Sequence, residues 1–467
     1  MKSKLHFTFL FISLVVFRHT YAQISEFKIT ASDGEEHDAF GKSVSISGDY
    51  AVVGAWFDDG FRGSAYVFKR SGTTWVQEAK LLPSDGIGGG WFGVSASISG
   101  DYIIVGASGN NAGRGSAYVF KRTGTSWTEQ AKLRASDGAS IDFFGLVSIS
   151  GDYAIVGAPA DDDNGDASGS AYIFKRIGTS WVQEAKLLPS DGAGGDLFGA
   201  SASISGDYAV VGARNSKHYV FKRTGTTWVQ EAKLLPSEAF GGEPFVSLYG
   251  DYAALMSGGS AYVFKRTGTS WTQEAKLIPS DGASGFSVSI SGDFAVLGAR
   301  NSGSAFVFKR NGTSWTEEAK LIPSDGTAGD EFGTAVSISG DYAIVTAIAD
   351  DDNGDDSGSA YLYTGFATAV GIENEKMGLP AEFALSQNYP NPFNPETVIE
   401  YTLSRSGDVS LIVYNLRGEE VALLIDSNMP AGNHRVGWDA SNFASGIYFY
   451  RLQAGEFVQT RKMVLLR

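Results

Sequence analysis

The chain of 467 residues contains no cysteine and only five histidines. Without thiols no disulfide can form, so the folded chain has to be stabilised by packing, to which bound ions are one possible addition. Beyond the first 22 residues only His37, His218 and His434 remain, and they lie on unrelated segments. A Ser-His-Asp triad or a histidine-based metal site therefore has little support, and we assign no catalytic residue.

Positive charge is also scarce, because 37 Lys and Arg stand against 52 Asp and Glu and leave a formal net charge of −15. This balance argues against nucleic acid as a partner. The apolar run at residues 5–17 has about 13 residues, fewer than the roughly 20 that span a bilayer, so we expect no membrane span. Because Lys2 and Lys4 precede this run and Ala22 follows it, residues 1–22 are predicted to form a signal peptide.

Short strands and tight turns are abundant, and they recur as a unit. Ser-Gly-Asp-Tyr or a near copy occurs seven times at intervals of 42 to 55 residues, with its glycine at Gly48, Gly100, Gly151, Gly206, Gly250, Gly292 and Gly340. In the first unit, strands are expected at residues 43–47, 50–55, 63–70 and 75–81. Seven units of four antiparallel strands predict an all-β chain with a seven-bladed β-propeller over residues 23–364.

The two ends of the array predict how the ring closes. The seventh unit stops after residues 358–363 and has no fourth strand. Residues 26–34 match residues 78–86, which contain the end of the fourth strand of the first unit. We therefore expect the N-terminal segment to pair as the outer strand of the last blade, because closure removes the unpaired strand edges of an open array.

The repeats resemble the FG-GAP family, whose best-known members are the seven-bladed propellers of integrin α-subunits. The residues that carry the resemblance are Phe40-Gly41, Phe92-Gly93, Phe144-Gly145, Phe198-Gly199 and Phe332-Gly333, followed by Gly54-Ala55, Gly106-Ala107, Gly157-Ala158, Gly212-Ala213 and Gly298-Ala299. The fifth and sixth units depart most from this pattern. The Phe-Gly and Gly-Ala loops are expected on one rim of the propeller and the Gly-Asp turns on the other.

Two loops on the first rim are strongly acidic, at residues 161–166 and 350–355. Crowded carboxylates repel one another unless they are solvated or bridged by a hard cation, and oxygen ligands suit Ca²⁺. The FG-GAP resemblance also implies Ca²⁺ loops here, although Ala160 and Ala349 stand where the first ligand is expected. The candidate ligands are Asp161, Asp162, Asp163, Asn164, Asp166, Asp350, Asp351, Asp352, Asn353 and Asp355. The alternative is a solvated acidic turn without a metal.

The same rim holds candidate ligand-binding aromatic residues, namely Trp56, Phe57, Phe61 and Trp91. Exposed rings offer flat apolar faces for sugars or for protein side chains. The alternative is that Trp91 packs between blades. Six other tryptophans occupy one repeated strand position and are predicted to be structural. Six Lys-Arg pairs stand at the ends of the third strands and are expected beside the Gly-Asp turns, whose carboxylates offset the positive charge of these pairs.

The composition changes after residue 364, where residues 365–382 are predicted to be a linker. Strand-like runs follow at residues 397–403, 409–415, 420–425, 434–438, 447–453 and 457–466, so residues 383–467 are expected to form a small Ig-like β-sandwich. The tail closely resembles the type A C-terminal sorting domain of the type IX secretion system, through residues 388–395, 413–418, 437–439, 445–448 and 462–467. The resemblance implies handling by the type IX machinery and a secreted or surface-attached protein. The alternative is an ordinary accessory sandwich.

These observations favour a secreted or surface-attached propeller that binds an extracellular protein or glycan through its Phe-Gly/Gly-Ala rim. A carbohydrate-active enzyme is the first alternative, and it would need a pair of carboxylates over the central channel. The second is a purely structural surface component, since the units look like copies of one another.

Overall fold

The computed structural model describes residues 24–86, 90–238, 241–242, 244–366, 383–388, 391–403, 407–429, 432–455 and 457–466. The chain divides into two compact units, residues 1–370 and 371–467, and each is considered by itself. The predicted signal peptide and residues 367–382 of the predicted linker lie outside the described part. Phe366 is fully buried in the core of the last blade, so the first unit extends at least to this residue.

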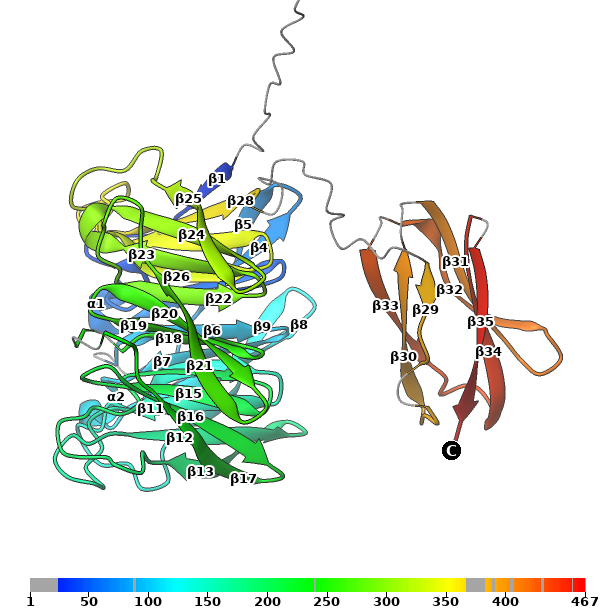
Figure 1. Cartoon of the computed structure of the whole chain (residues 1–467), viewed down its shortest axis with the longest axis horizontal. Helices are drawn as coiled ribbons and strands as arrows, with labels where there is room; N and C mark the ends of the chain where they lie inside the picture. The colour runs from blue at the N-terminus through cyan, green and yellow to red at the C-terminus, as the bar shows by residue number, and fades with distance from the viewer. Residues whose placement is uncertain are drawn as a thin grey trace, which may run out of the picture. The chain divides into compact units, whose positions relative to one another are not determined.

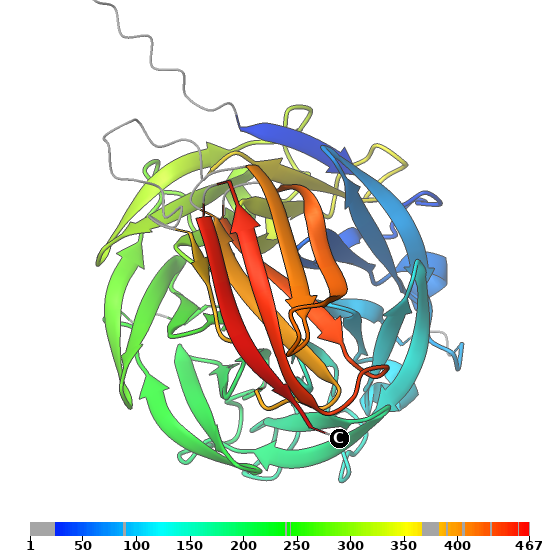
Figure 2. The same cartoon turned by 90° about the vertical axis from the view of Figure 1, so that its right-hand side faces the viewer.

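The first unit consists of seven four-stranded antiparallel sheets arranged as a ring (Figures 1 and 2), which confirms the predicted propeller. Blade 1 contains β2 (Phe40–Ser47), β3 (Tyr50–Ala55), β4 (Ser64–Ser71) and β5 (Thr74–Leu81). Blade 2 contains β6 (Phe92–Ser99), β7 (Tyr102–Ala107), β8 (Ser116–Thr123) and β9 (Ser126–Leu133). Blade 3 contains β10 (Leu146–Ser150), β11 (Tyr153–Ala158), β12 (Ser170–Ile177) and β13 (Ser180–Leu187).

Blade 4 contains β14 (Ser201–Ser205), β15 (Tyr208–Ala213), β16 (Lys217–Thr224) and β17 (Thr227–Leu234). Blade 5 contains β18 (Val246–Tyr249), β19 (Tyr252–Ser257), β20 (Ser260–Thr267) and β21 (Ser270–Leu277). Blade 6 contains β22 (Ser287–Ser291), β23 (Phe294–Ala299), β24 (Ser304–Asn311) and β25 (Ser314–Leu321). Blade 7 contains β26 (Phe332–Ser339), β27 (Tyr342–Ala347), β28 (Ser359–Thr364) and the N-terminal strand β1 (Ser25–Ile29). Three single-turn helices, α1 (Asp58–Phe61), α2 (Asn110–Gly113) and η1 (Arg300–Ser302), lie in loops between second and third strands.

The N-terminal strand closes the ring as predicted, since β1 pairs antiparallel with β28 from Ser25↔Thr364 to Ile29↔Ala360. Its register agrees with the sequence match at Phe27, Lys28 and Ile29 and is offset by one residue at Ser25 and Glu26. The other outer strands carry a β-bulge, for example at Glu78, which β1 lacks. Glu26 therefore takes the place of Gln77: its carboxylate accepts the Ser324 N–H at 3.2 Å, as Gln77 accepts the Ser32 N–H at 3.0 Å.

The motif glycines let neighbouring blades approach closely. A Cβ built on Gly54 would lie 2.0 Å from the carbonyl oxygen of Gly93 in the next blade, and one on Gly106 would lie 1.7 Å from that of Gly145. No side chain fits at these distances. The glycine of Gly-Ala in one blade thus packs against the Phe-Gly backbone of the next, which gives both halves of the repeated pattern a structural reason.

The alternating serines of the innermost strands join each blade to the next around the central channel. The Ser45 hydroxyl accepts the Ile98 N–H at 3.2 Å, and across the closure Ser337 accepts the Ile46 N–H at 3.2 Å. Serine hydroxyls at the other boundaries accept a backbone N–H of the next blade in the same way. They are Ser95 and Ser97 with blade 3, Ser148 with blade 4, Ser201 and Ser203 with blade 5, Ser247 with blade 6 and Ser289 with blade 7. Inner strands have one unpaired edge, and these hydroxyls satisfy its donors.

The repeated tryptophans of the outer strands contact the preceding blade, in agreement with a structural role. The Trp127 indole packs edge-on against Tyr50, with ring centroids 6.0 Å apart, and its Nε1 donates to Glu78 at 3.1 Å. The indoles of Trp181, Trp228, Trp271 and Trp315 likewise donate to Gln130, Glu184, Glu231 and Glu274. The serines therefore join the blades at the channel, and the six tryptophans join six of the seven blade pairs at the circumference, since β1 carries no tryptophan.

The second unit contains two antiparallel sheets that share one core. The first has β29 (Ala384–Leu385), β30 (Glu396–Leu403) and β33 (Gly432–Asp439), and the second has β31 (Gly407–Tyr414), β32 (Glu420–Met429), β34 (Gly446–Ala454) and β35 (Phe457–Leu465). Ile399 and Tyr401 of the first sheet are buried in one cluster with Leu411 and Leu452 of the second. The six predicted strands are all present. None of the helices in the described ranges has the length and apolar character that a bilayer crossing requires.

Deletion of residues 23–30 is expected to lower the melting temperature of the propeller by several degrees. The deletion leaves β28 as an open edge and removes Lys28 and Glu26 from their partners in blade 7. Differential scanning calorimetry that compares residues 23–366 with residues 31–366 measures the effect. A synthetic peptide of residues 23–34 added to the truncated protein should restore part of the loss, and an unchanged melting temperature would contradict closure by β1.

Candidate functional site

The loops between second and third strands, together with the segments that lead into each first strand, form one rim of the propeller, here called the loop rim. The helices α1 and α2 lie on this side (Figure 1). The residue before the Phe-Gly phenylalanine has a left-handed backbone in five blades, with φ between 49° and 55° at Ala39, Trp91, Phe143, Leu197 and Glu331. Non-glycine residues rarely adopt this conformation, so the fold holds these five side chains in fixed positions on the rim.

The four predicted aromatic residues form one contiguous group on the loop rim. Trp56 stacks on Phe57, with ring centroids 4.0 Å apart, and Phe57 contacts Phe61 at 4.7 Å. Trp91 of the next blade lies 6.0 Å from Trp56 and parallel to Phe143 at 6.2 Å. The group therefore spans the first three blades, and we call these five residues the aromatic patch.

Sequence reasoning missed Phe143, although a signal was present. Phe143-Phe144 stands in the third unit where Trp91-Phe92 stands in the second, so the position before the Phe-Gly motif is aromatic in both. Ile141 beside it has 62% of its surface exposed and Phe61 has 52%. These exposures leave apolar surface open at both ends of the patch.

Two cations lie beside the aromatic patch. Lys42 Nζ is 4.6 Å from the centroid of the Trp56 ring, and Arg62 donates to Asp59 at 2.6 Å. The buried Trp56 Nε1 has no hydrogen-bond partner in the described part of the chain. Flat rings flanked by hydrogen-bonding groups can stack on a sugar ring or on an aromatic side chain of a protein.

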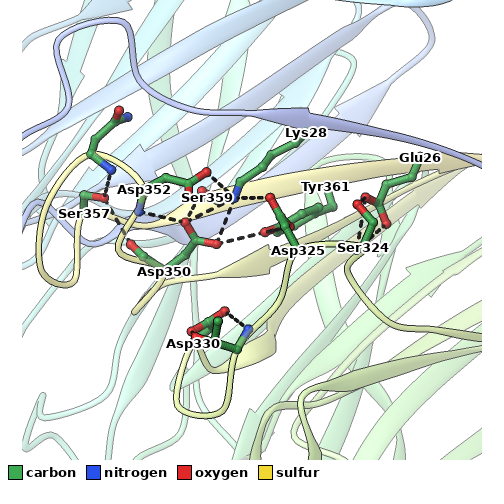
Figure 3. Close-up of polar contacts among 12 residues, drawn as sticks. Glu26, Lys28, Ser324, Asp325, Asp330, Asp350, Asp352, Ser357, Ser359 and Tyr361 are labelled. Carbon is green, nitrogen blue, oxygen red and sulfur yellow. Dashed lines mark hydrogen bonds and ion pairs between the residues drawn. The ribbon is translucent and has the colours of Figure 1, made fainter.

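The first aspartate of each acidic loop is buried and serves as an internal hydrogen-bond acceptor. Asp161 is 5% exposed, and its carboxylate accepts from the Ser170 hydroxyl and the Tyr172 hydroxyl, both at 2.8 Å. In blade 7 Asp350 is 4% exposed and accepts in the same way from Ser359 at 2.9 Å and Tyr361 at 2.8 Å (Figure 3). Both loops are therefore built on a carboxylate that is already satisfied by the scaffold.

A lysine of the outer strand completes each acidic loop. Lys186 Nζ lies 2.8 Å from Asp137, 3.1 Å from Asp161 and 2.6 Å from Asp163. Partial burial acts against the charged form, but the hydrogen bonds to Asp137 and Asp163 raise the pKa of Lys186 well above its usual range. Lys28 has the same arrangement in blade 7, and its pKa is raised for the same reason.

The predicted calcium ligands thus fall into an inner and an outer group. The inner group, Asp161 with Asp163 and Asp350 with Asp352, faces a lysine ammonium, so these oxygens do not fit a calcium ion while the lysine is in place. The outer group, Asp162, Asn164, Asp166, Asp351, Asn353 and Asp355, is exposed. In blade 7, oxygens of Asp351, Asp355 and Asp356 lie within 4.8 Å of one another. Calcium binding stays a prediction for the outer group.

Similar ionic contacts join all blades. The acidic residue of each connection between blades pairs with the lysine of the following outer strand, in the pairs Asp33–Lys80, Asp85–Lys132, Asp137–Lys186, Asp191–Lys233, Glu238–Lys276, Asp281–Lys320 and Asp325–Lys28. Partial burial acts against the charged form of Asp325, but hydrogen bonds from Lys28 and Tyr361 lower its pKa below the usual range. The ionic contacts therefore favour the folded state when both partners are charged.

The opposite rim carries the Lys-Arg pairs, and their arginines are neutralised by the Gly-Asp turns as expected. Arg70, Arg122, Arg176, Arg223, Arg266 and Arg310 donate to Asp49, Asp101, Asp152, Asp207, Asp251 and Asp293. Each guanidinium also stacks on a tyrosine of the preceding blade, as Arg122 does on Tyr50 at 4.4 Å. These contacts offset the basic charge that an anionic polymer would need.

Family comparison now decides the class of repeat. The family model described as FG-GAP repeat matches this chain at residues 25–68, 75–120, 127–174, 181–225, 271–308 and 315–363. The chain belongs to the FG-GAP repeat family. The divergent fifth unit is the one without a match. Residues 387–466 match the secretion system C-terminal sorting domain, which supports export by the type IX secretion system and a secreted or outer-membrane surface location.

A solved structure of WD40 repeats agrees with the propeller fold of this FG-GAP protein. The crystal structure of RRP9 WD40 repeats is similar over 73% of this chain and 99% of that chain, with 10% identity and a TM-score of 0.50. The structure of U3-55K covers 73% of this chain and 98% of that chain, with 10% identity and a TM-score of 0.49. At this identity the first likeness concerns the fold alone. No curated protein matches the chain.

The ionic contacts predict a two-sided pH dependence of stability. Aspartates with lowered pKa, such as Asp137 and Asp325, stabilise the fold above the unfolded value of about 3.9, and this stabilisation is lost as the pH falls through their folded pKa. Lysines with raised pKa stabilise fully below about 10.4, and the contribution is lost as the pH rises through their folded pKa. Melting temperatures should therefore be highest between these limits. A melting temperature that rises on acidification below about pH 4 would contradict the assignment.

Proposed function

We propose that the mature protein is an extracellular binding or adhesion module, exported by the type IX system and engaging its ligand through the loop rim. The observation that carries this proposal is the aromatic patch. Five aromatic side chains from three blades gather on one rim, whereas the repeated tryptophans of the outer strands pack between blades. Phe61 is 52% exposed and its ring contacts Phe57, so its exposed apolar surface belongs to a contiguous group of rings.

The patch suits a ligand that offers flat apolar faces, namely a glycan or a protein with exposed aromatic or aliphatic side chains. The loop rim differs between blades, while the strands are near copies. Variable loops on a constant scaffold are how propellers and other rigid folds usually present a binding surface.

No observation on the described residues favours the enzyme alternative. The channel opens at the loop rim into a cavity of about 360 Å³ that is lined by residues of the seven innermost strands. Its described lining includes Lys42, serines and apolar side chains but no Asp or Glu, which a glycosidase would need in a pair. Propeller repeat families are mainly non-catalytic scaffolds, which also supports a binding role.

Alanine at Trp91 or Phe61 is expected to weaken ligand binding by on the order of tenfold or more, because buried aromatic anchors dominate binding energy. Residues 24–366 are first screened on a glycan array and against surface proteins of the producing cells, and the affinity of the best ligand is then measured by calorimetry. Val229→Ala is the matched control, since Val229 is 57% exposed and lies near the start of the outer strand β17, opposite Lys222 on the rim that carries the Lys-Arg pairs. Equal affinities of wild type and Trp91→Ala would contradict the proposed site.

The sorting domain is expected to be sufficient for export. A periplasmic reporter fused to residues 380–467 should reach the cell surface or the medium of a host with a type IX system, whereas a reporter fused to residues 24–366 should stay in the periplasm. Immunoblots of periplasm, outer membrane and medium measure the distribution. Retention of the first fusion in the periplasm would count against sorting by this domain.

A further inference from the structure

Two lysines of outer strands lie where the acidic loops of the loop rim would otherwise hold a cation. In blade 7, Lys28 Nζ is 2.8 Å from Asp325, 3.0 Å from Asp350 and 2.5 Å from Asp352 (Figure 3). Blade 3 repeats this arrangement around Lys186. An ammonium group has three N–H donors, and here each can point to a different carboxylate.

We propose that the ammonium groups of Lys186 and Lys28 take the place of a divalent cation in these two loops, so that the chain carries its own counter-ion there. The lysine comes from the outer strand of the same blade, and the carboxylates come from the loop after the second strand and from the connection before the blade. One side chain thereby fastens two loops that are far apart in the sequence, which is what a bound metal ion would do.

The charges explain why a single lysine is enough. Only the first loop aspartate is buried, with side-chain exposures of 6% for Asp161 and 5% for Asp350. The other two carboxylates at Lys28, Asp325 and Asp352, are 46% and 55% exposed and are screened by water. The lysine has to balance one buried negative charge, because an unpaired buried carboxylate is costly.

Other blades support the proposal, because the lysine contacts more carboxylates where the loop after the second strand contains more aspartates. Lys80 contacts Asp33 and Asp58, both at 2.7 Å, in a loop with two consecutive aspartates. In blade 4, where the loop is Arg-Asn-Ser, Lys233 pairs with Asp191. The lysine is thus a constant part of the scaffold, and the acidic loops have been built around it in blades 3 and 7.

The test is to remove the ammonium and supply calcium. Lys186→Met keeps most of the side-chain volume and leaves three carboxylates facing one another, so its melting temperature should fall by several degrees in calcium-free buffer. Millimolar CaCl₂, at ionic strength matched with NaCl, should restore most of this loss and should shift wild type less. Lys233→Met is the matched control, since it loses one ion pair but has no acidic loop, and calcium should not restore its stability.

Several results would overturn the proposal. One is an equal calcium shift for wild type and Lys186→Met, and another is a Lys186→Met protein as stable as wild type without calcium. If Lys186→Met folds only with calcium, the proposal is supported. If it does not fold at all, the double variant K186M/D163N decides, because removing one carboxylate together with the lysine should recover a folded protein, and failure to do so would contradict a charge-balancing role.

Discussion

The pairing of β1 with β28 is the contact on which the propeller depends, because it completes the last blade as a four-stranded sheet. The closing strand supplies more than backbone hydrogen bonds. Lys28 on β1 enters the acidic loop of blade 7, and Glu26 on the same strand holds the connection at Ser324. A segment from the beginning of the chain therefore completes both the sheet and the loop-fastening contacts of a blade whose other strands come more than 300 residues later.

The same few contacts repeat around the ring, and each crosses a boundary between blades. Serine hydroxyls join inner strands, tryptophans join outer strands, and arginines stack on tyrosines near the Gly-Asp turns. This explains why the strands are near copies while the loops are not. A change in a strand disturbs contacts with neighbouring blades, whereas most residues of the acidic loops between the first aspartate and the last serine are exposed.

Much of the fold could be predicted from the sequence, because each strand and turn pattern occurs several times along the chain. The number of blades, the closure, the positions of the hairpins and the sorting domain all followed from spacing and motif. The offset of one residue at Ser25 and Glu26 did not, because the sequence alternation does not show that β1 lacks the β-bulge found at positions such as Glu78. Phe143 could have been found from the aromatic residue that precedes Phe-Gly in units two and three, whereas its left-handed backbone is visible only in the three-dimensional structure. The lysines of the acidic loops were missed because they lie on outer strands, with Lys186 25 residues from Asp161 and Lys28 322 residues from Asp350.

The lysine contacts also bear on the aromatic patch. Asp58 is buried between Phe57 and Phe61, and its carboxylate accepts from Ser64 and from Tyr66 and pairs with Lys80 at 2.7 Å. The outer strand of blade 1 thus fixes the start of the loop that presents two rings of the patch. In blade 2 the corresponding residue is Asn110, which donates to Tyr118 at 2.7 Å. A rigid anchor below each loop lets the side chains above it vary without loss of their position, and this preorganisation is what a binding surface on a repeat scaffold requires.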